Sequence, residues 1–150
     1  MAKGTLIIGC GNPQRCDDGV GEYVISQLEA KLPADLEAKA IVVHQLDVEL
    51  VDEIKNWEQV ILVDATCERF KRGWKCVKVI PEKQMTNFSH HLSPSMLLSL
   101  VESVHKKKPK FFIFSIKGHN FNFGSVLSPR TKKAADEVVV EILRLLKNQS

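Results

Sequence analysis

The sequence predicts an α/β fold of three layers, in which helices cover both faces of a mostly parallel, five-stranded sheet. Short apolar runs typical of buried strands alternate with segments whose apolar residues recur at helical spacing. The connection from the third apolar run to the fourth is too short for the crossover that joins parallel strands, so the fourth strand is expected to be antiparallel. Without a repeat or a linker, residues 1–150 are expected to form a single domain.

In the first half of the chain, the predicted strands are the short apolar runs at residues 5–9, 40–44 and 59–64. An apolar stripe at helical spacing predicts an amphipathic helix over residues 19–31, which Pro33 ends. A second helix of about two turns is predicted over residues 46–54, where four apolar residues recur at the same spacing.

In the second half, the predicted antiparallel strand covers about residues 74–80, and Cys76 is expected to be a small buried residue within it. A helix is predicted over residues 94–104, with Ser93 as its N-cap and a proline in its first turn. The remaining predicted elements are a strand, a loop and a closing helix, at residues 111–116, 118–126 and 128–147.

Composition and charge exclude several classes of protein. The net charge of +3 arises from 21 basic and 18 acidic residues spread along the chain, which does not favour nucleic-acid binding. No apolar run approaches the ~20 residues that span a bilayer, and no secretion signal is recognisable, so we expect a cytoplasmic protein that does not use a membrane. The basic residues 106–110 are interpreted as a solvated turn, with a docking patch for an acidic partner as the alternative.

The cysteines do not indicate a structural zinc site. Cys10, Cys16, Cys67 and Cys76 lack the Cys-x-x-Cys spacing of such a site, and in a reducing cytoplasm they are expected to be thiols. Catalysis by a thiolate is an alternative for which Cys16 is the best candidate, because it lies close to a helix N-terminus. Nothing in the sequence places a base beside it.

Polar side chains from separate segments are expected to meet beyond the carboxyl ends of the parallel strands, where ligands bind in such sheets. They are Asp17 and Asp18 after the first strand, Asp64 at the end of the third, and His90 and His91 before a helix. Singly, each has a structural explanation: one aspartate of the pair caps the following helix, Asp64 begins a turn, and the histidines are solvated. Together, two carboxylates and an imidazole form a site suited to a divalent metal such as nickel, copper, iron or zinc.

The turn after the first strand does not match the sequences that bind phosphate. A dinucleotide fingerprint needs its third glycine where Gln14 stands, and Pro13 comes directly before it. The lysine and hydroxyl of a P-loop are absent as well. A general α/β hydrolase is also disfavoured, because the chain contains no Gly-x-Ser-x-Gly elbow.

The same segments resemble the hydrogenase maturation endopeptidases. The resemblance rests on Gly-x-Gly-Asn-Pro-x-Arg-x-Asp-Asp-Gly-Val-Gly after the first strand, Val-Asp-Ala at the end of the third, and Ser-His-His-Leu before a helix. Phe-x-Phe-Gly-x-x-Leu-Ser at residues 121–128 looks like the closing segment of that family, and residues 44–50 are similar to the branch serving bidirectional hydrogenases. The likeness spans essentially the whole chain and implies a phosphorylase/hydrolase-like fold.

The resemblance implies an endopeptidase that removes a C-terminal extension from the nickel-loaded precursor of a [NiFe]-hydrogenase large subunit. It assigns metal recognition and catalysis to Asp18, Asp64 and His90, with His91 as the fallback. No permanent cofactor is expected, because the nickel is carried by the substrate, although another divalent metal can bind adventitiously. The expected partner is the large-subunit precursor, and the protein is expected to be a monomer.

Three questions stay open from the sequence. Asn12 and Arg15 are expected either to shape the turn or to bind substrate, and shaping of the turn is the favoured role. Cys16 stands where the family commonly has glycine. The attacking water is activated either by a metal or by an aspartate acting as general base. The alternative function is a non-catalytic nickel-binding maturation factor, a metallochaperone or sensor, that uses the same three residues.

Overall fold

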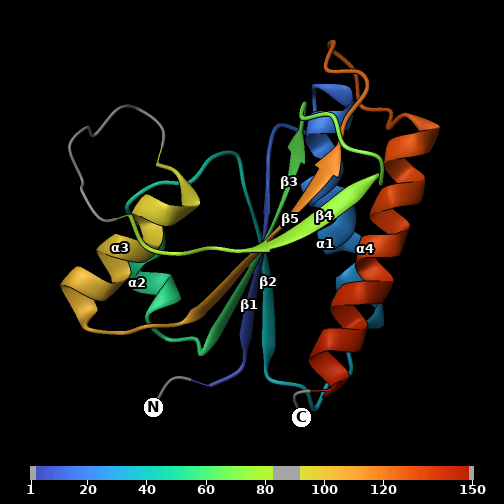
Figure 1. The fold of residues 1–150 in the computed structure, drawn as a ribbon. Helices are drawn as coiled ribbons and strands as arrows, with labels where there is room; N and C mark the ends of the chain where they lie inside the picture. Colours follow the sequence, from blue (N-terminus) through green and yellow to red (C-terminus); the bar gives the residue numbers. More distant parts are fainter. Residues whose placement is uncertain (1–2, 83–91, 149–150) are drawn as a thin grey trace.

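The computed structural model describes residues 3–82 and 92–148, which form a five-stranded sheet with helices on both faces (Figure 1). The strand order is β2-β1-β3-β5-β4, and β4 alone runs antiparallel to its neighbour. This confirms the predicted fold class and the predicted direction of β4. The strands are β1 Thr5–Cys10, β2 Ala38–Val43, β3 Gln59–Thr66, β4 Trp74–Lys78 and β5 Lys110–Lys117.

The helices divide into two pairs that cover opposite faces of the sheet. Figure 1 shows α1 and α4 on one face and α2 and α3 on the other. A single turn of 3-10 helix, η1, leads directly into α1. Their bounds are η1 Cys16–Gly19, α1 Val20–Lys31, α2 Leu50–Ile54, α3 Pro94–His105 and α4 Pro129–Asn148.

The alternation of side chains along β1 builds a separate core on each face of the sheet. Ile7 is fully buried in the cluster with α1 and α4, whereas Leu6, Ile8 and Cys10 belong to the cluster with α2 and α3. Because β1 is covered on both faces, its sequence is a continuous run of buried residues and does not alternate between apolar and polar ones. The central strands are thus packed on both faces, and the loops at their carboxyl ends begin from well-buried positions.

The helix α2 is shorter than the sequence predicts. It begins at Leu50 rather than near Leu46, because the amide of Glu49 donates to Oδ1 of Asp47 at 2.8 Å and holds the intervening residues in a turn. Leu46 is still buried, so the apolar spacing indicates burial correctly but not helix.

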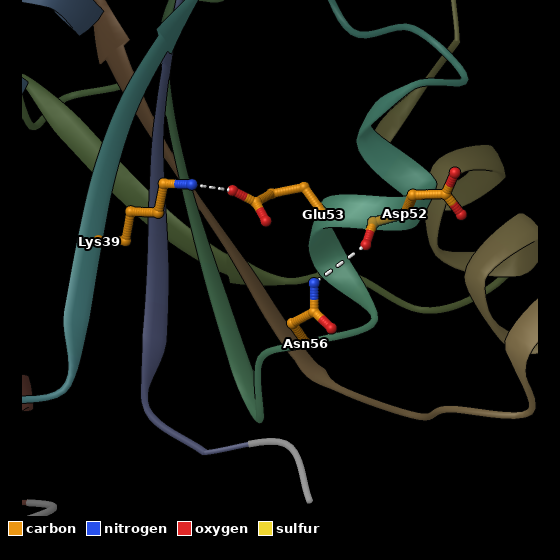
Figure 2. A network of polar contacts seen from close by, with 4 residues as sticks. All are labelled: Lys39, Asp52, Glu53 and Asn56. Atoms are coloured by element: carbon orange, nitrogen blue, oxygen red, sulfur yellow. Dashed lines mark hydrogen bonds and ion pairs between the residues drawn. The ribbon is translucent and has the colours of Figure 1, made fainter.

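Polar contacts fasten α2 to both of its neighbours. Figure 2 shows Glu53 paired with Lys39 of β2, and the Asn56 side-chain amide donating to the Asp52 carbonyl at 3.3 Å. The carboxylate of Asp52 lies 2.9 Å from Nε2 of His105 at the end of α3. These contacts orient a short helix whose own backbone hydrogen bonds are few.

Two further expectations have different outcomes. Ser93 does cap α3, since its hydroxyl accepts from the amide of Met96 at 3.1 Å. The expectation for Cys76 was wrong, because its side chain is exposed. The strand β4 lies at the edge of the sheet, and Trp74 is its one buried residue. None of the helices within residues 3–82 and 92–148 is long and apolar enough to cross a membrane.

Candidate functional site

The carboxyl ends of β1 and β3 lie side by side where the strand order reverses. The chain passes from β1 to β2 on one side, whereas β3 pairs with β1 on the other, with Gly9 opposite Val63. In sheets of this kind such a reversal opens a crevice in which ligands bind. Asp64 directly follows Val63, so it emerges beside the turn that begins after Cys10.

The turn after β1 is shaped by Asn12. The Oδ1 atom of Asn12 accepts from the amide of Gln14 at 2.9 Å, and its carbonyl accepts from the amide of Arg15 at 3.1 Å. The amide of Asn12 donates to Oδ2 of Asp18 at 2.8 Å, which orients that carboxylate. Gly11 has φ +134°, and a Cβ there would lie 2.1 Å from the carbonyl oxygen of Asp18. The turn therefore requires glycine at this position.

Asp18 and Asp64 are close enough to influence each other electrostatically. Burial raises the pKa of Asp64 to about 6; a hydrogen bond from the Ala65 amide at 2.8 Å opposes this rise, and the charge of Asp18 adds to it. Burial also raises the pKa of the Cys10 thiol to about 12, with contributions from Asp64 and Asp18. The two predicted carboxylates therefore lie near each other, and both lie near the buried thiol of Cys10.

The predicted imidazole lies outside the described residues, as does its fallback, His91. Leu92, where the description of the chain resumes, packs against the cluster that contains Ile8 and Cys10. Within residues 3–82 and 92–148, no three His, Cys, Asp or Glu side chains could together hold a metal ion. The structure therefore brings together Asp18 and Asp64 and leaves the position of His90 untested.

Asp17 has a role that the sequence did not indicate. Its buried carboxylate accepts from the amides of His119 and Asn120 at 2.7 and 2.9 Å, and from the amide and hydroxyl of Ser128 at 2.7 and 2.8 Å. Burial works against its ionised form, but these hydrogen bonds outweigh it and lower the pKa of Asp17. Neither η1 nor α1 has a side-chain cap, so the expectation that one aspartate of the pair caps this helix was wrong.

Arg15 and Cys16 attach the turn to the segment that precedes α4. The Nε–H of Arg15 donates to the carbonyl of Phe121 at 3.3 Å, and the guanidinium lies 5.1 Å from the centre of the Phe123 ring. The amide of Cys16 donates to the carbonyl of Gly124 at 2.7 Å. In Figure 1, this orange segment lies beside the blue η1 and the tips of β3 and β5. Arg15 and Asn12 both shape the site, whatever else they contact.

Cys16 adopts a backbone conformation that favours glycine. Its φ is +48°, in the left-handed region, where a side chain is disfavoured by about 1–2 kcal/mol. This is a physical reason for the glycine that the resembling family commonly has here. The thiol is buried against Gly124, which is a poor position for a nucleophile that must reach a substrate.

The arrangement suits hydrolytic or metal-recognition chemistry. A carboxyl group whose pKa is about 6 is poised to exchange a proton near neutral pH, and a second carboxylate beside it supplies further oxygen ligands. The turn after β1 is not arranged to cradle a phosphate, because the amides of Asn12 and Gln14 already donate to the side chains of Asp18 and Asn12.

Comparisons of the sequence with known proteins give one relative over nearly the full length. No protein-family model matches the chain. A protein of Methanocaldococcus jannaschii named "Putative hydrogenase maturation protease" is 32% identical over 155 residues, covering 97% of both chains.

Comparisons with solved structures give the same fold. The hydrogenase maturating endopeptidase HybD from E. coli superimposes with a TM-score of 0.75 at 18% identity, covering 98% of this chain and 94% of that chain. The [NiFe] hydrogenase maturation protease HycI from Thermococcus kodakarensis also gives a TM-score of 0.75, at 19% identity, covering 96% and 92%. At these identities, the structures show a shared fold.

Proposed function

Because the chain belongs to the hydrogenase maturation proteases and is therefore a peptidase, we propose that it removes a C-terminal extension from the nickel-loaded precursor of a [NiFe]-hydrogenase large subunit. Asp18, Asp64 and His90 recognise the nickel of the substrate and so place the scissile peptide bond at the crevice. The single observation that carries this proposal is the parallel pairing of β1 with β3, which brings Asp64 beside the turn that carries Asp18. The charge of Asp18 contributes to the raised pKa of Asp64, in agreement with this placement.

The two carboxylates have different surroundings and so are suited to different roles. Asp18 is held by the amide of Asn12, which presents its other oxygen as a fixed ligand. Asp64 has a pKa of about 6, so near neutral pH it can accept a proton from an attacking water and return it to the leaving amine. Activation of water by the metal itself is the competing route. In both routes the chain supplies orientation and proton transfer, and the metal arrives with the substrate.

The proposal includes the setting in which the protein works. It acts as a cytoplasmic monomer on the folded precursor, with no resident cofactor and no contact with nucleic acid or membrane.

Intact-mass analysis of the precursor from the same organism tests the proposal. The precursor, with and without nickel, is mixed with the wild-type protein and with the variants Asp18→Asn, Asp64→Asn and His90→Ala. We expect the precursor to lose mass only when it carries nickel and is mixed with the wild-type protein or with the surface variant Asp35→Asn, which is the matched control. Normal cleavage by all three site variants would refute the site assignment. Stoichiometric binding of nickel to the isolated protein without any shortening of the precursor would instead indicate the non-catalytic nickel-binding factor.

A further inference from the structure

A second cleft, of about 330 Å³, lies behind the segment that Asp17 anchors. Its lining residues come from the segment just before β4, from the end of β5 and the residues after it, and from the first turns of α4. We call it the basic cleft, because four of the eight residues that line it are lysine or arginine and one is histidine. The lining residues are Lys71, Gly73, Lys117, His119, Arg130, Lys133, Ala134 and Glu137.

The cations of the basic cleft are not neutralised by the protein. Lys71, Arg130 and Lys133 are exposed, and none of them forms an ion pair with a carboxylate in the part of the chain that the structure describes. The ammonium of Lys117 donates to the carbonyl of Phe70 at 2.8 Å, which orients the group without cancelling its charge. A cluster of unneutralised cations attracts an anion.

The one carboxylate in the cleft is already engaged. Oε1 of Glu137 accepts from the indole Nε1–H of Trp74 at 3.0 Å, and the guanidinium of Arg72 lies 3.8 Å from the centre of the Trp74 ring. Glu137 forms no ion pair with the cations of the cleft in the part of the chain that the structure describes, and one carboxylate against four cations leaves the lining with a net positive charge. The cleft keeps a positive field and has room for a carboxylate.

The position of these cations on α4 is unfavourable for the helix itself. The N-terminal end of a helix carries a partial positive charge that favours acidic side chains, yet the first turn of α4 has none. Arg130 and Lys133 instead add positive charge to that end. The buried carboxylate of Asp17, which accepts from the amide and hydroxyl of Ser128, supplies negative charge beside this end of the helix. It forms no ion pair with Arg130 or Lys133, so within the described residues these two cations remain available to an external anion.

The basic cleft and the crevice share one short segment of chain. His119 lines the cleft, and its amide donates to Asp17, the residue directly before Asp18. The amide of Gly118 donates to the carbonyl of Thr66, two residues after Asp64. An extended peptide advances about 3.3 Å per residue, so a few residues beyond a bond cleaved at the crevice would reach around this segment.

We propose that the basic cleft binds the C-terminal carboxylate of the extension that is removed from the precursor. This rests on the proposed function, since an enzyme that releases a C-terminal piece must accommodate a chain end that always carries a negative charge. Arg130 and Lys133 bind the carboxylate, and Lys71 contributes to the field on the opposite wall. The contact holds the extension at both ends, with the metal centre at the crevice and the chain terminus in the cleft.

Binding of a short peptide tests the site without any cleavage. The probe is a fluorescent peptide copied from the last eight or so residues of the precursor, made with a free C-terminal carboxylate and as the C-terminal amide. We expect the amide to bind on the order of tenfold more weakly, and Arg130→Gln/Lys133→Gln to weaken the free acid by a similar factor. Lys107→Gln, which removes one exposed cation remote from the cleft, should leave binding unchanged.

Binding of both peptides to both proteins tests whether the carboxylate is recognised by Arg130 and Lys133. In the double variant, the preference for the acid over the amide should shrink to a small residue, because only Lys71 and Lys117 remain to attract the carboxylate. Equal binding of acid and amide by the wild-type protein would overturn the proposal, as would a preference for the acid that is as large in the double variant as in the wild type. Thermal unfolding of each variant confirms that folding is unchanged.

Processing kinetics separate this inference from the proposed function. With intact precursor, the double variant should raise KM several-fold and leave kcat nearly unchanged, because the contact lies away from the reacting bond. If wild-type protein cleaves the precursor and the double variant does so with the same KM, the cleft proposal fails while the peptidase stands. If the wild-type protein does not cleave, the proposed function fails, and preferential binding of the free acid still reports on the cleft.

Discussion

Asp17 and Ser128 form a two-point contact that ties the turn after β1 to the start of α4. Oδ1 of Asp17 accepts from the backbone amide of Ser128 at 2.7 Å, and Oδ2 accepts from its hydroxyl at 2.8 Å. The same carboxylate holds the amides of His119 and Asn120. The neighbouring Asp18 is thereby attached to a buried anchor, so its position depends on contacts that it does not make itself.

Removing this anchor should cost stability. Asp17→Ala is expected to lower the free energy of unfolding by about 3 kcal/mol, because four partly buried donors lose a charged acceptor that is itself fully buried. Urea denaturation at pH 7 measures the change. The surface variant Asp35→Ala should shift the free energy by less than about 0.5 kcal/mol. A loss as small as that of the control would show that water replaces the carboxylate.

The same anchor predicts an acid sensitivity. Hydrogen bonds outweigh burial and lower the pKa of Asp17 below its ordinary value of 3.8. A lowered folded-state pKa gives stability that is present above 3.8 and is lost as the pH falls through the folded-state value. The wild-type protein should therefore lose stability more steeply than Asp17→Asn below about pH 4. Urea midpoints measured at intervals from pH 5 to pH 2 check this, and parallel curves for the two proteins would contradict it.

The raised pKa of Asp64 predicts the opposite pH dependence of the free energy of unfolding. Burial raises its pKa from 3.8 to about 6, with help from Asp18 and against the hydrogen bond from Ala65. The native state therefore holds a proton that the unfolded state releases between these values, so this residue's contribution to stability falls as the pH rises from about 4 to 6. Asp64→Asn should remove that fall, and a slope equal to that of the wild type would contradict it.

The coupling between the two carboxylates can be measured directly. Carboxyl-carbon NMR should give Asp64 a pKa near 6 in the wild type and a lower value in Asp18→Asn, because that substitution removes a neighbouring negative charge. Asp35→Asn provides the matched control and should leave the titration of Asp64 unchanged. An unchanged titration in Asp18→Asn would show that the two carboxylates do not interact.

The part of the site that could be predicted from sequence is the part that strand topology determines. Asp64 ends a continuous apolar run, and the carboxyl ends of parallel strands share one edge, so its meeting with the turn that carries Asp18 follows from the pattern. The role of Asp17 could not be predicted, because its partners lie more than 100 residues further along the chain and are mostly backbone amides. The prediction that Cys76 is buried was wrong for a related reason, since apolar spacing does not show which strand lies at the sheet edge.

The buried thiols should be inert, which bears on the cysteine alternative. Cys10 has a pKa raised to about 12, so at pH 8 about one molecule in ten thousand carries a thiolate there. Cys16 is buried, whereas Cys67 and Cys76 are exposed. Iodoacetamide should therefore label Cys67 and Cys76 in the native protein, and Cys10 and Cys16 only after unfolding, as peptide mass analysis would show. Processing should survive this labelling, and its loss in step with alkylation of Cys16 would support a cysteine nucleophile.

Two substitutions of Cys16 test whether its backbone conformation is strained. Its φ of +48° disfavours any side chain, and its thiol packs against Gly124. Both Cys16→Ala and Cys16→Gly lose the contact of the thiol, but only glycine also relieves the left-handed strain. Cys16→Gly should therefore be more stable than Cys16→Ala by about 1 kcal/mol in urea denaturation. Equal stability of the two variants would mean that the turn relaxes around the side chain, and the strain argument would fail with it.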